Sequence, residues 1–383
     1  MKVAGLFAGI GGVEHGLHRA GHTTVLNCEI DPIAQAVLGD RFPDVPIHSD
    51  VRELKKLPQG TELLAGGFPC QDISQAGRTK GIDGKNSGLV NEVFRLLAKN
   101  DVPHVLLENV SFILALGRGH AMRHLTSELE RLGYRWAYRV VDTRAFGLPQ
   151  RRQRMFLFAS RIYEPMEFLM VGNETPDDTE DWRGRACGFY WTEGVRGLGW
   201  AVDAVPTLKN GSTVGIASPP AIWLPDGRIV TPNIRDAERM QGFDADWTIA
   251  AEQTARKGFR WKLVGNAVSV PVAEWIGQRL RHGPSPVDLR VRSFDPEHTW
   301  PAAAFGGPGQ RALKVEISMW PVAKKRPSLV AFLESEPKLL SFKGTAGFVS
   351  RLRSGTLRYP PEFMHALLRH LERMQVQPEL AVA

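Results

Sequence analysis

The sequence predicts an α/β fold built on a mostly parallel, doubly wound sheet. Over the first 160 residues, short apolar runs typical of strands alternate with helical patterns, as in a parallel sheet that is covered on both faces. The chain has 383 residues, which favours two or three domains. Its 43% hydrophobic and 23% charged residues are ordinary for a folded protein and argue against a disordered or collagenous chain.

The expected elements follow in order along the chain. In the first 160 residues the predicted strands are 2–7, 24–28, 62–65, 105–107 and 155–159, and the predicted helices are 13–20, 32–42 and 90–99. Residues 161–228 are irregular and rich in Gly, Pro and Trp, and helical patterns return at 234–240 and 268–280. We therefore expect a first domain over 1–160, a small domain over 161–233, a return segment over 234–283 that completes the first domain, and a C-terminal, mainly helical appendage over 284–383.

The charge balance favours an acidic partner. The 48 Lys and Arg exceed the 41 Asp and Glu, and the net charge of +7 suits a nucleic acid. Residues 285–383 contain 14 Lys and Arg but only 9 Asp and Glu. In this region His365, Arg369 and Arg373 form one stripe of a predicted helix. This stripe is either a solvated face or an added contact to nucleic acid. No apolar run reaches the roughly 18 residues needed to span a bilayer.

The cysteine content argues for a reducing compartment. Cys28, Cys70 and Cys187 are too few and too scattered for a disulfide framework. No Cys/His cluster has the spacing of metal ligands. We therefore expect a cytoplasmic protein that binds neither a metal nor a membrane.

A glycine turn near the N-terminus is the first candidate ligand site. The segment LFAGIGG, Leu6 to Gly12, leaves a short strand and opens a helix, so a ligand can approach the backbone closely. Glu29 ends the second predicted strand, where an acid can accept hydrogen bonds from ribose hydroxyls. Asp50 is placed to accept from an adenine amine. The alternative is a tight turn with two solvated carboxylates.

A second set of residues carries reactive side chains. Cys70, in GGFPCQDIS, and Glu108 each follow a predicted strand, so they can converge at the carboxyl edge of the sheet. Burial there would raise the pKa of Glu108 and let it hold a proton near neutrality. Arg152 and Arg154 alternate along a predicted strand and should share a face. Taken singly, Cys70 is also compatible with a small buried apolar residue and the arginines with a solvated edge.

The order of these motifs resembles the DNA cytosine-5 methyltransferases over residues 1–280. The motifs are FAGIGG, an acid at Glu29, Pro-Cys-Gln at 69–71, Glu-Asn-Val at 108–110, QRRQR at 150–154, an Arg-rich helix with Gln-Gly-Phe at 235–243, and GNAVSVPV at 265–272. The resemblance implies a Rossmann-like, S-adenosylmethionine-dependent methyltransferase fold. Three places depart from the family pattern. Gly5 stands where an acid is usual, Ile30 stands where an aromatic residue is common, and residues 89–92 lack an aromatic residue that is common there.

The resemblance also implies a role for each candidate residue. S-adenosylmethionine would contact Phe7, Ala8, Gly9, Gly11, Gly12, Glu29, Ile30, Asp50, Val51, Pro69, Asn266 and Val268. Cys70 would attack C6 of a flipped-out cytosine, and Glu108 would engage N3 and the exocyclic amine. Arg152 and Arg154 would steady the base and the adduct. Gln71 and Ser74 would lie beside the reacting base.

Recognition of a DNA sequence is expected from the small domain over 161–233. Its candidate DNA contacts are Arg183, Arg185, Lys209 and Asn210, and its tryptophans are interpreted as core anchors rather than base stackers. The glycine-rich, cationic loop after Cys70 carries Arg78 and Lys80 and is interpreted as a lid that closes over DNA. The catalytic core should be complete by about Gly283.

The resulting hypothesis is a DNA cytosine-5 methyltransferase that modifies a specific duplex sequence through a covalent Cys70–C6 adduct. It would be monomeric and serve a restriction-modification system, whose restriction endonuclease acts on the same sequence without direct contact. Three alternatives stay open: the tRNA-methylating branch of the same family, a nicotinamide-dependent oxidoreductase, and a catalytically silent DNA-binding module. The oxidoreductase would explain the glycine turn and Glu29, but not the set Cys70, Glu108 and Arg152.

Overall fold

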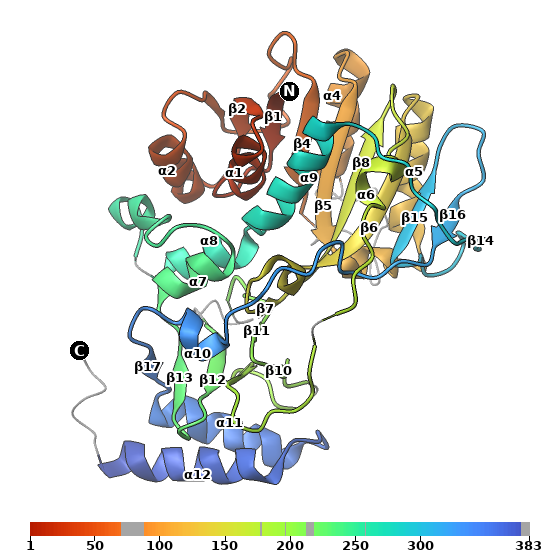
Figure 1. The fold of residues 1–383 in the computed structure, drawn as a ribbon. Helices are drawn as coiled ribbons and strands as arrows, with labels where there is room; N and C mark the ends of the chain where they lie inside the picture. The colour runs from red at the N-terminus through yellow and green to blue at the C-terminus, as the bar shows by residue number, and fades with distance from the viewer. Residues whose placement is uncertain (70–87, 177, 196, 212–217, 257, 377–383) are drawn as a thin grey trace. The chain divides into compact units, whose positions relative to one another are not determined.

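The computed structural model describes residues 1–69, 88–176, 178–195, 197–211, 218–256 and 258–376. These residues form two compact units (Figure 1). Unit 1 consists of the described parts of 1–146, 153–176 and 267–323, and unit 2 of those of 147–152, 177–266 and 324–383. Each unit therefore collects segments that are far apart in the sequence.

Unit 1 is built on a ten-stranded sheet. One half is parallel, in the order β3 (Ile47–His48), β2 (Thr23–Cys28), β1 (Lys2–Leu6), β4 (Leu63–Gly67) and β5 (His104–Val110). Antiparallel pairing then continues through β8 (Gln153–Ser160), β6 (Arg135–Asp142), β15 (Ala303–Gly306), β16 (Leu313–Val315) and β14 (Val291–Ser293). The strand and helix alternation expected near the N-terminus forms the parallel half, because parallel neighbours need a crossover connection.

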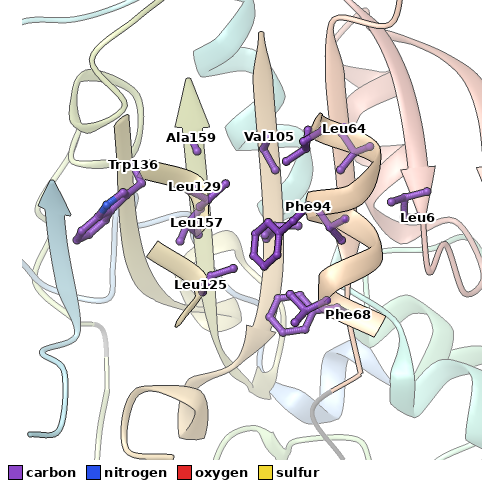
Figure 2. Close-up of a cluster of buried hydrophobic side chains, with 14 of the residues drawn as sticks. Leu6, Leu64, Phe68, Phe94, Val105, Leu125, Leu129, Trp136, Leu157 and Ala159 are labelled. Atoms are coloured by element: carbon purple, nitrogen blue, oxygen red, sulfur yellow. The ribbon is translucent and has the colours of Figure 1, made fainter. Parts of the chain in front are cut away.

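Helices cover both faces of this sheet (Figure 1). One face carries α4 (Gly88–Lys99) and α5 (His120–Arg131), and the other carries α1 (Gly12–Arg19), α6 (Met166–Leu169) and α9 (Val270–His282). Successive strand residues point to opposite faces, so Val105 enters the first core and Leu106 the second. Figure 2 shows the first core, where Phe94 of α4 and Leu125 of α5 lie against the sheet.

Three short elements complete the N-terminal part of unit 1. They are α2 (Pro32–Arg41) and the single 3-10 turns η2 (Ser111–Leu114) and η3 (Thr143–Phe146). The side chain of Asp31 caps α2 by accepting the N–H of Ile33 at 3.0 Å. This cap fixes where the chain turns after Glu29.

Residues 284–323 extend the sheet of unit 1. β15 pairs antiparallel with β6, from Ala303 opposite Arg139 to Gly306 opposite Trp136. Trp300 is only 4% exposed and belongs to the first core. This differs from the expectation of a core complete by about Gly283. The difference arises because β15 is short and its partner β6 lies far earlier in the chain, so no local pattern announces the pairing.

Unit 2 contains a five-stranded antiparallel sheet in the order β10 (Ala201–Val202), β9 (Cys187–Phe189), β12 (Ala221–Trp223), β13 (Ile229–Thr231) and β17 (Lys338–Leu339). A second sheet pairs β7 (Gln150–Arg151) with β11 (Val205–Pro206). The helices are α7 (Ile234–Met240), α8 (Phe259–Asn266), α10 (Leu329–Phe332), α11 (Phe342–Ser354) and α12 (Pro361–Val376), with the 3-10 turn η4 (Ile249–Gln253).

The core of unit 2 joins its sheet to the last two helices. The ring of Phe189 on β9 lies 5.1 Å from that of Phe348 on α11 and 4.9 Å from that of Phe363 on α12, measured between centroids. All three side chains are fully buried. The expected helix over 234–240 is present as α7. Across the described parts of both units, no helix is long and apolar enough to cross a membrane.

Candidate active site

The turn between β1 and α1 has a backbone that favours glycine. Phe7, Gly9 and Gly11 have φ values of 54°, 57° and 81°, all in the left-handed region. A Cβ at Gly11 would lie 2.4 Å from the ring of Phe42, so only glycine fits there. At Gly9 no described atom lies within 4 Å of the Cβ position, which leaves room for a ligand beside the backbone. Phe7 is a non-glycine residue held at positive φ, a strained conformation of a kind that clusters at functional sites.

Glu29 follows β2 and holds this turn. Its Oε2 accepts the N–H of Gly9 at 2.7 Å and its Oε1 accepts the N–H of Asp31 at 2.8 Å. Burial raises the pKa of Glu29, while the two N–H donors act in the opposite direction. Each carboxyl oxygen keeps a further lone pair that can accept a ligand hydroxyl. The structure thus joins Glu29 to the glycine turn through the N–H of Gly9.

The other residues predicted to contact the cofactor differ in accessibility. Asp50 accepts the Nε–H of Arg52 at 2.9 Å, and this hydrogen bond lowers the pKa of Asp50. Ile30 is 63% exposed, whereas Val51 is 5% exposed, so only the first can offer its side chain to a ligand. Pro69 is exposed at the end of the described chain that follows β4.

Glu108 lies at the carboxyl ends of two neighbouring strands. Gly67, the last residue of β4, is the pairing partner of Glu108 on β5. A Cβ at Gly67 would lie 3.0 Å from Oε2 of Glu108 and 3.8 Å from Cγ2 of Val268, so glycine leaves room for the carboxylate. Nε of Arg154 lies 3.1 Å from Oε1 of Glu108, and both side chains are largely buried. The structure therefore brings Glu108, Arg154 and Val268 together.

Asn109 is a site residue whose side chain was given no role by the sequence reasoning. Its amide Nδ2 donates to the carbonyl of Phe68 at 3.0 Å, and its Oδ1 accepts the N–H of Val110 at 2.8 Å. Phe68 stands two positions before Cys70. Asn109 therefore fixes the chain that leads to the predicted nucleophile. Its place beside Glu108 in the Glu-Asn-Val motif was the available signal.

The predicted nucleophile and the residues after it lie outside the described residues. These are Cys70, Gln71, Ser74, Arg78 and Lys80.

The two described cysteines are unsuited to nucleophilic attack. Cys28 and Cys187 are buried free thiols, and burial raises the pKa of each to about 12. Such a thiol has almost no thiolate at neutral pH. Among the described side chains, no group of three His, Cys, Asp or Glu is arranged to hold a metal ion.

Arg152 is held differently from Arg154. It lies between β7 and β8, so the expectation that both arginines share one face of a strand is wrong. Its Nη1 donates to the carbonyls of Leu208 at 3.2 Å and Gly265 at 3.3 Å, and the side chain is 1% exposed. Within unit 2 Arg152 therefore ties the chain at Leu208 to the end of α8 at Gly265.

The end of α8 lies in the same part of unit 2. Asn266, predicted to contact the cofactor, is the exposed last residue of α8. At its neighbour Gly265, a Cβ would meet the carbonyl oxygen of Lys209 at 2.3 Å. Glycine is therefore required where the Lys209–Asn210 peptide packs on the helix end.

The four described DNA candidates, Arg183, Arg185, Lys209 and Asn210, lie in unit 2. The first two line a hollow of about 450 Å3, together with Asp203 and the C-terminal residues Ser328 and Val330.

Trp191 and Trp200 of unit 2 are core anchors, as expected. Trp191 and Trp200 pack against the buried cluster that contains Phe363. The ring of Trp200 lies 5.0 Å from that of Phe363, and Nε1 of Trp191 donates to the carbonyl of Pro219 at 2.8 Å.

Glu14 is a second residue without a sequence-based role. It lies in the first turn of α1 and is 1% exposed, and burial raises its pKa to about 8. A Cβ at Gly5 would lie 2.2 Å from Oε1 of Glu14 and 3.2 Å from Oδ1 of Asn27. The departure at Gly5 therefore has a structural reason, because the Glu14 carboxyl from α1 occupies the space that a side chain at position 5 would need.

Comparison with known proteins now identifies the family. A model of the C-5 cytosine-specific DNA methylases matches residues 1–184 and 190–282. The chain belongs to this family. It is therefore a DNA cytosine-5 methyltransferase, and the predicted fold class and enzyme class are confirmed.

Individual relatives agree with this assignment. The chain is 47% identical to the Type II methyltransferase M2.BsuMI of Bacillus subtilis (strain 168) over 97% of its own length and 99% of that protein. It is 28% identical to the Type II methyltransferase M.MspI of Moraxella sp over 73% of this chain and 70% of that one. The Entamoeba histolytica methyltransferase EhMeth shares the fold, with a TM-score of 0.55 and 15% identity over 74% of this chain and 98% of that one.

Proposed function

We propose that this DNA cytosine-5 methyltransferase uses S-adenosylmethionine as methyl donor, Cys70 as nucleophile, and Glu108 and Arg154 to hold the reacting cytosine. The supporting observation is the Glu108–Arg154 pair beside Gly67, at the strand ends from which the chain continues to Pro69 and Cys70. We further propose, from the names of its relatives, that the enzyme modifies a specific duplex sequence for a restriction-modification system.

The cofactor pocket is proposed at the glycine turn. The open space at Gly9, the left-handed backbone of Phe7 and the lone pairs of Glu29 fit a nucleoside that lies against this backbone. Glu29 would accept the ribose hydroxyls. Asp50 can accept from an amine only if Arg52 leaves it room, since Arg52 already binds its carboxylate. When bound, S-adenosylmethionine would supply a methyl group that is attached to a sulfonium. In the transfer the sulfur keeps the electron pair of the S–CH3 bond and becomes a thioether.

The reaction proceeds through a covalent adduct of the base. The thiolate of Cys70 forms a bond to C6, and the electrons of the C5–C6 double bond become available for a new bond from C5 to the methyl carbon. Glu108, in contact with N3 and the exocyclic amine, supports the charge that shifts onto the ring. Loss of the C5 proton then restores the double bond and expels the sulfur of Cys70.

DNA contacts are proposed for both described and undescribed residues. Extrusion of a base from the duplex costs a few kcal/mol, which contacts to the backbone and the gap must offset. Arg78 and Lys80 are proposed for the closing loop, and Arg183, Arg185, Lys209 and Asn210 for sequence reading. Arg152, which donates to two backbone carbonyls, is proposed to steady the base and the adduct together with Arg154.

Covalent trapping tests this function. Fluorine at C5 cannot leave as a proton, so a duplex with 5-fluorocytosine at the target base should form a lasting adduct with the enzyme when S-adenosylmethionine is present. The Cys70→Ala variant should form none. An adduct at Cys28 or Cys187 would contradict the assignment of the nucleophile. A tRNA substrate in the same assay tests the alternative branch, and methylation of tRNA without methylation of duplex DNA would overturn the choice of substrate.

A further inference from the structure

The C-terminal segment 324–376 is an integral part of unit 2. Its strand β17 pairs with β13, and the N–H of Leu340 donates to the carbonyl of Ile229 at 3.0 Å. Its helices α11 and α12 supply Phe348 and Phe363 to the core. The family model ends at residue 282, so no family motif assigns a role to this segment.

Helix α11 binds the segment 190–194, which we call the 190–194 loop, through hydrogen bonds. The guanidinium of Arg351 donates from Nε to the carbonyl of Glu193 at 2.9 Å and from Nη2 to the carbonyl of Trp191 at 2.8 Å. The contact is close, because a Cβ at Gly194 would lie 3.2 Å from the ring of Phe348. One planar group on α11 therefore binds two backbone carbonyls of the loop.

The 190–194 loop in turn holds Lys209. The carboxylate of Glu193 forms an ion pair with Nζ of Lys209. That Nζ also lies over the ring of Tyr190, 3.6 Å from its centroid. The hydroxyl of Tyr190 donates to the carbonyl of Thr207 at 2.7 Å. Two side chains of the loop thus determine where Lys209 points.

The segment 207–210 is also held by contacts that do not involve the 190–194 loop. Oγ1 of Thr207 donates to the carbonyl of Arg151 at 2.8 Å, and the Lys209–Asn210 peptide packs against Gly265. These contacts hold the main chain but leave the Lys209 side chain to the loop. Loss of the loop support should therefore change the direction of Lys209 without unfolding the segment.

We infer that α11 is a positioning element for target recognition, in which Arg351 fixes the 190–194 loop and the loop aims Lys209 at DNA. This inference rests on the DNA-reading role proposed above for Lys209. The positive charge of residues 324–383 favours a position near DNA phosphates, because these residues include ten Lys and Arg but only five Asp and Glu. Arg351 itself contacts protein carbonyls and is a positioning residue, not a reader of bases.

The test compares Arg351→Ala with Arg353→Ala, an exposed arginine on the same helix. Each variant methylates a pool of duplexes with randomised base pairs around one cytosine, and bisulfite sequencing reports which sequences were modified. We expect Arg351→Ala to lose roughly tenfold in discrimination, the effect of one weakened base contact. Arg353→Ala should keep the wild-type preference, and both variants should bind S-adenosylmethionine as the wild type does. Arg351→Lys should rescue part of the loss.

A second variant keeps the inference open to refutation if Arg351→Ala does not fold. Glu193→Gln keeps the backbone carbonyl that Arg351 binds but removes the charge that pairs with Lys209. It should therefore also reduce the discrimination between DNA sequences. Unchanged preference in a folded Arg351→Ala or in Glu193→Gln overturns the inference, while the proposed function stands if the wild type methylates the pool. A wild type that methylates none of the duplexes would instead refute the proposed function.

Discussion

Single carboxylates at the edge of the unit 1 sheet have different surroundings and should have separable roles. Glu29 receives two backbone N–H groups and holds the glycine turn, whereas Glu108 pairs with the side chain of Arg154. We propose that the first arrangement binds the cofactor and that the second acts on the base. Cofactor affinity and turnover should therefore respond to different substitutions.

Glu29→Ala should weaken S-adenosylmethionine binding by about 1.5–3 kcal/mol, the usual range for hydrogen bonds to a charged group. Glu108→Gln should bind the cofactor normally and lose turnover, because an amide cannot supply a proton to N3. Titration calorimetry measures the first effect and single-turnover methylation the second. Equal cofactor affinity in the wild type and Glu29→Ala would refute the ribose role.

The buried Glu14 should make stability depend on pH. Its pKa is raised to about 8 in the folded protein from an ordinary value of 4.5, so between these values the folded state keeps a proton that the unfolded state releases. The free energy of unfolding should then fall as pH rises through this window, by at most ~1.4 kcal/mol per pH unit from this group. Glu14→Gln should remove this contribution.

Urea unfolding at several pH values between those two limits measures the slope. Glu128→Gln is the control, because the hydrogen bond from Arg131 lowers the pKa of Glu128 and its removal should leave the Glu14 slope in place. An unchanged slope in Glu14→Gln would show that Glu14 does not carry this proton.

Among the elements, α1 and α9 approach each other through small residues. A Cβ at Gly16 of α1 would lie 2.6 Å from Cβ of Ala273 and 2.6 Å from the backbone N of Glu274. A Cβ at Gly277 of α9 would lie 2.7 Å from that of Ala20. This close packing holds α1, and with it the end of the glycine turn, against α9.

Gly16→Ala should destabilise unit 1 by about 1–3 kcal/mol, because the added methyl meets backbone that cannot give way. Gly39→Ala in α2 is the matched control, since no described atom lies within 4 Å of its Cβ position. That variant should gain about 0.5–1 kcal/mol from helix propensity. Denaturant unfolding of both variants measures the two signs, and a stabilised Gly16→Ala would contradict the tight packing of α1 on α9.

At the scale of the whole molecule, the last hundred residues serve both units. Residues 284–323 extend the sheet of unit 1, and the described part of 324–383 joins unit 2. Trp300 packs beside Trp136 at 5.7 Å between ring centroids, and Phe363 fills the core of unit 2. Neither unit therefore has a complete core without this part of the chain.

Truncation after Gly283 should give an insoluble protein or one without cooperative unfolding. Trp300→Ala should cost about 3–5 kcal/mol through the lost burial and the cavity left behind. Arg311→Ala, at an exposed position of the same segment, is the control and should change stability by less than about 0.5 kcal/mol. A folded, cofactor-binding truncation would show that the catalytic core ends before this segment.

The sequence by itself predicted four of the five strands in the parallel half of the sheet, β1, β2, β4 and β5, and it offered the candidate reactive groups. The glycine turn, Glu29 and Glu108 each stand within a few residues of the strand that presents them, so local apolar patterns were enough to place them. Parallel strands also align their carboxyl ends, which is why residues of separate motifs could be expected at one edge.

Only the tertiary structure decided the contacts between segments far apart in the chain. Arg152 rests on the carbonyls of Leu208 and Gly265 because β7 ends before it, and no strand periodicity could show that break. The carboxyl of Glu14 fills the space beside Gly5, and Arg351 holds a loop more than a hundred residues earlier. Such contacts depend on three-dimensional packing and leave no periodic signal in the neighbouring sequence.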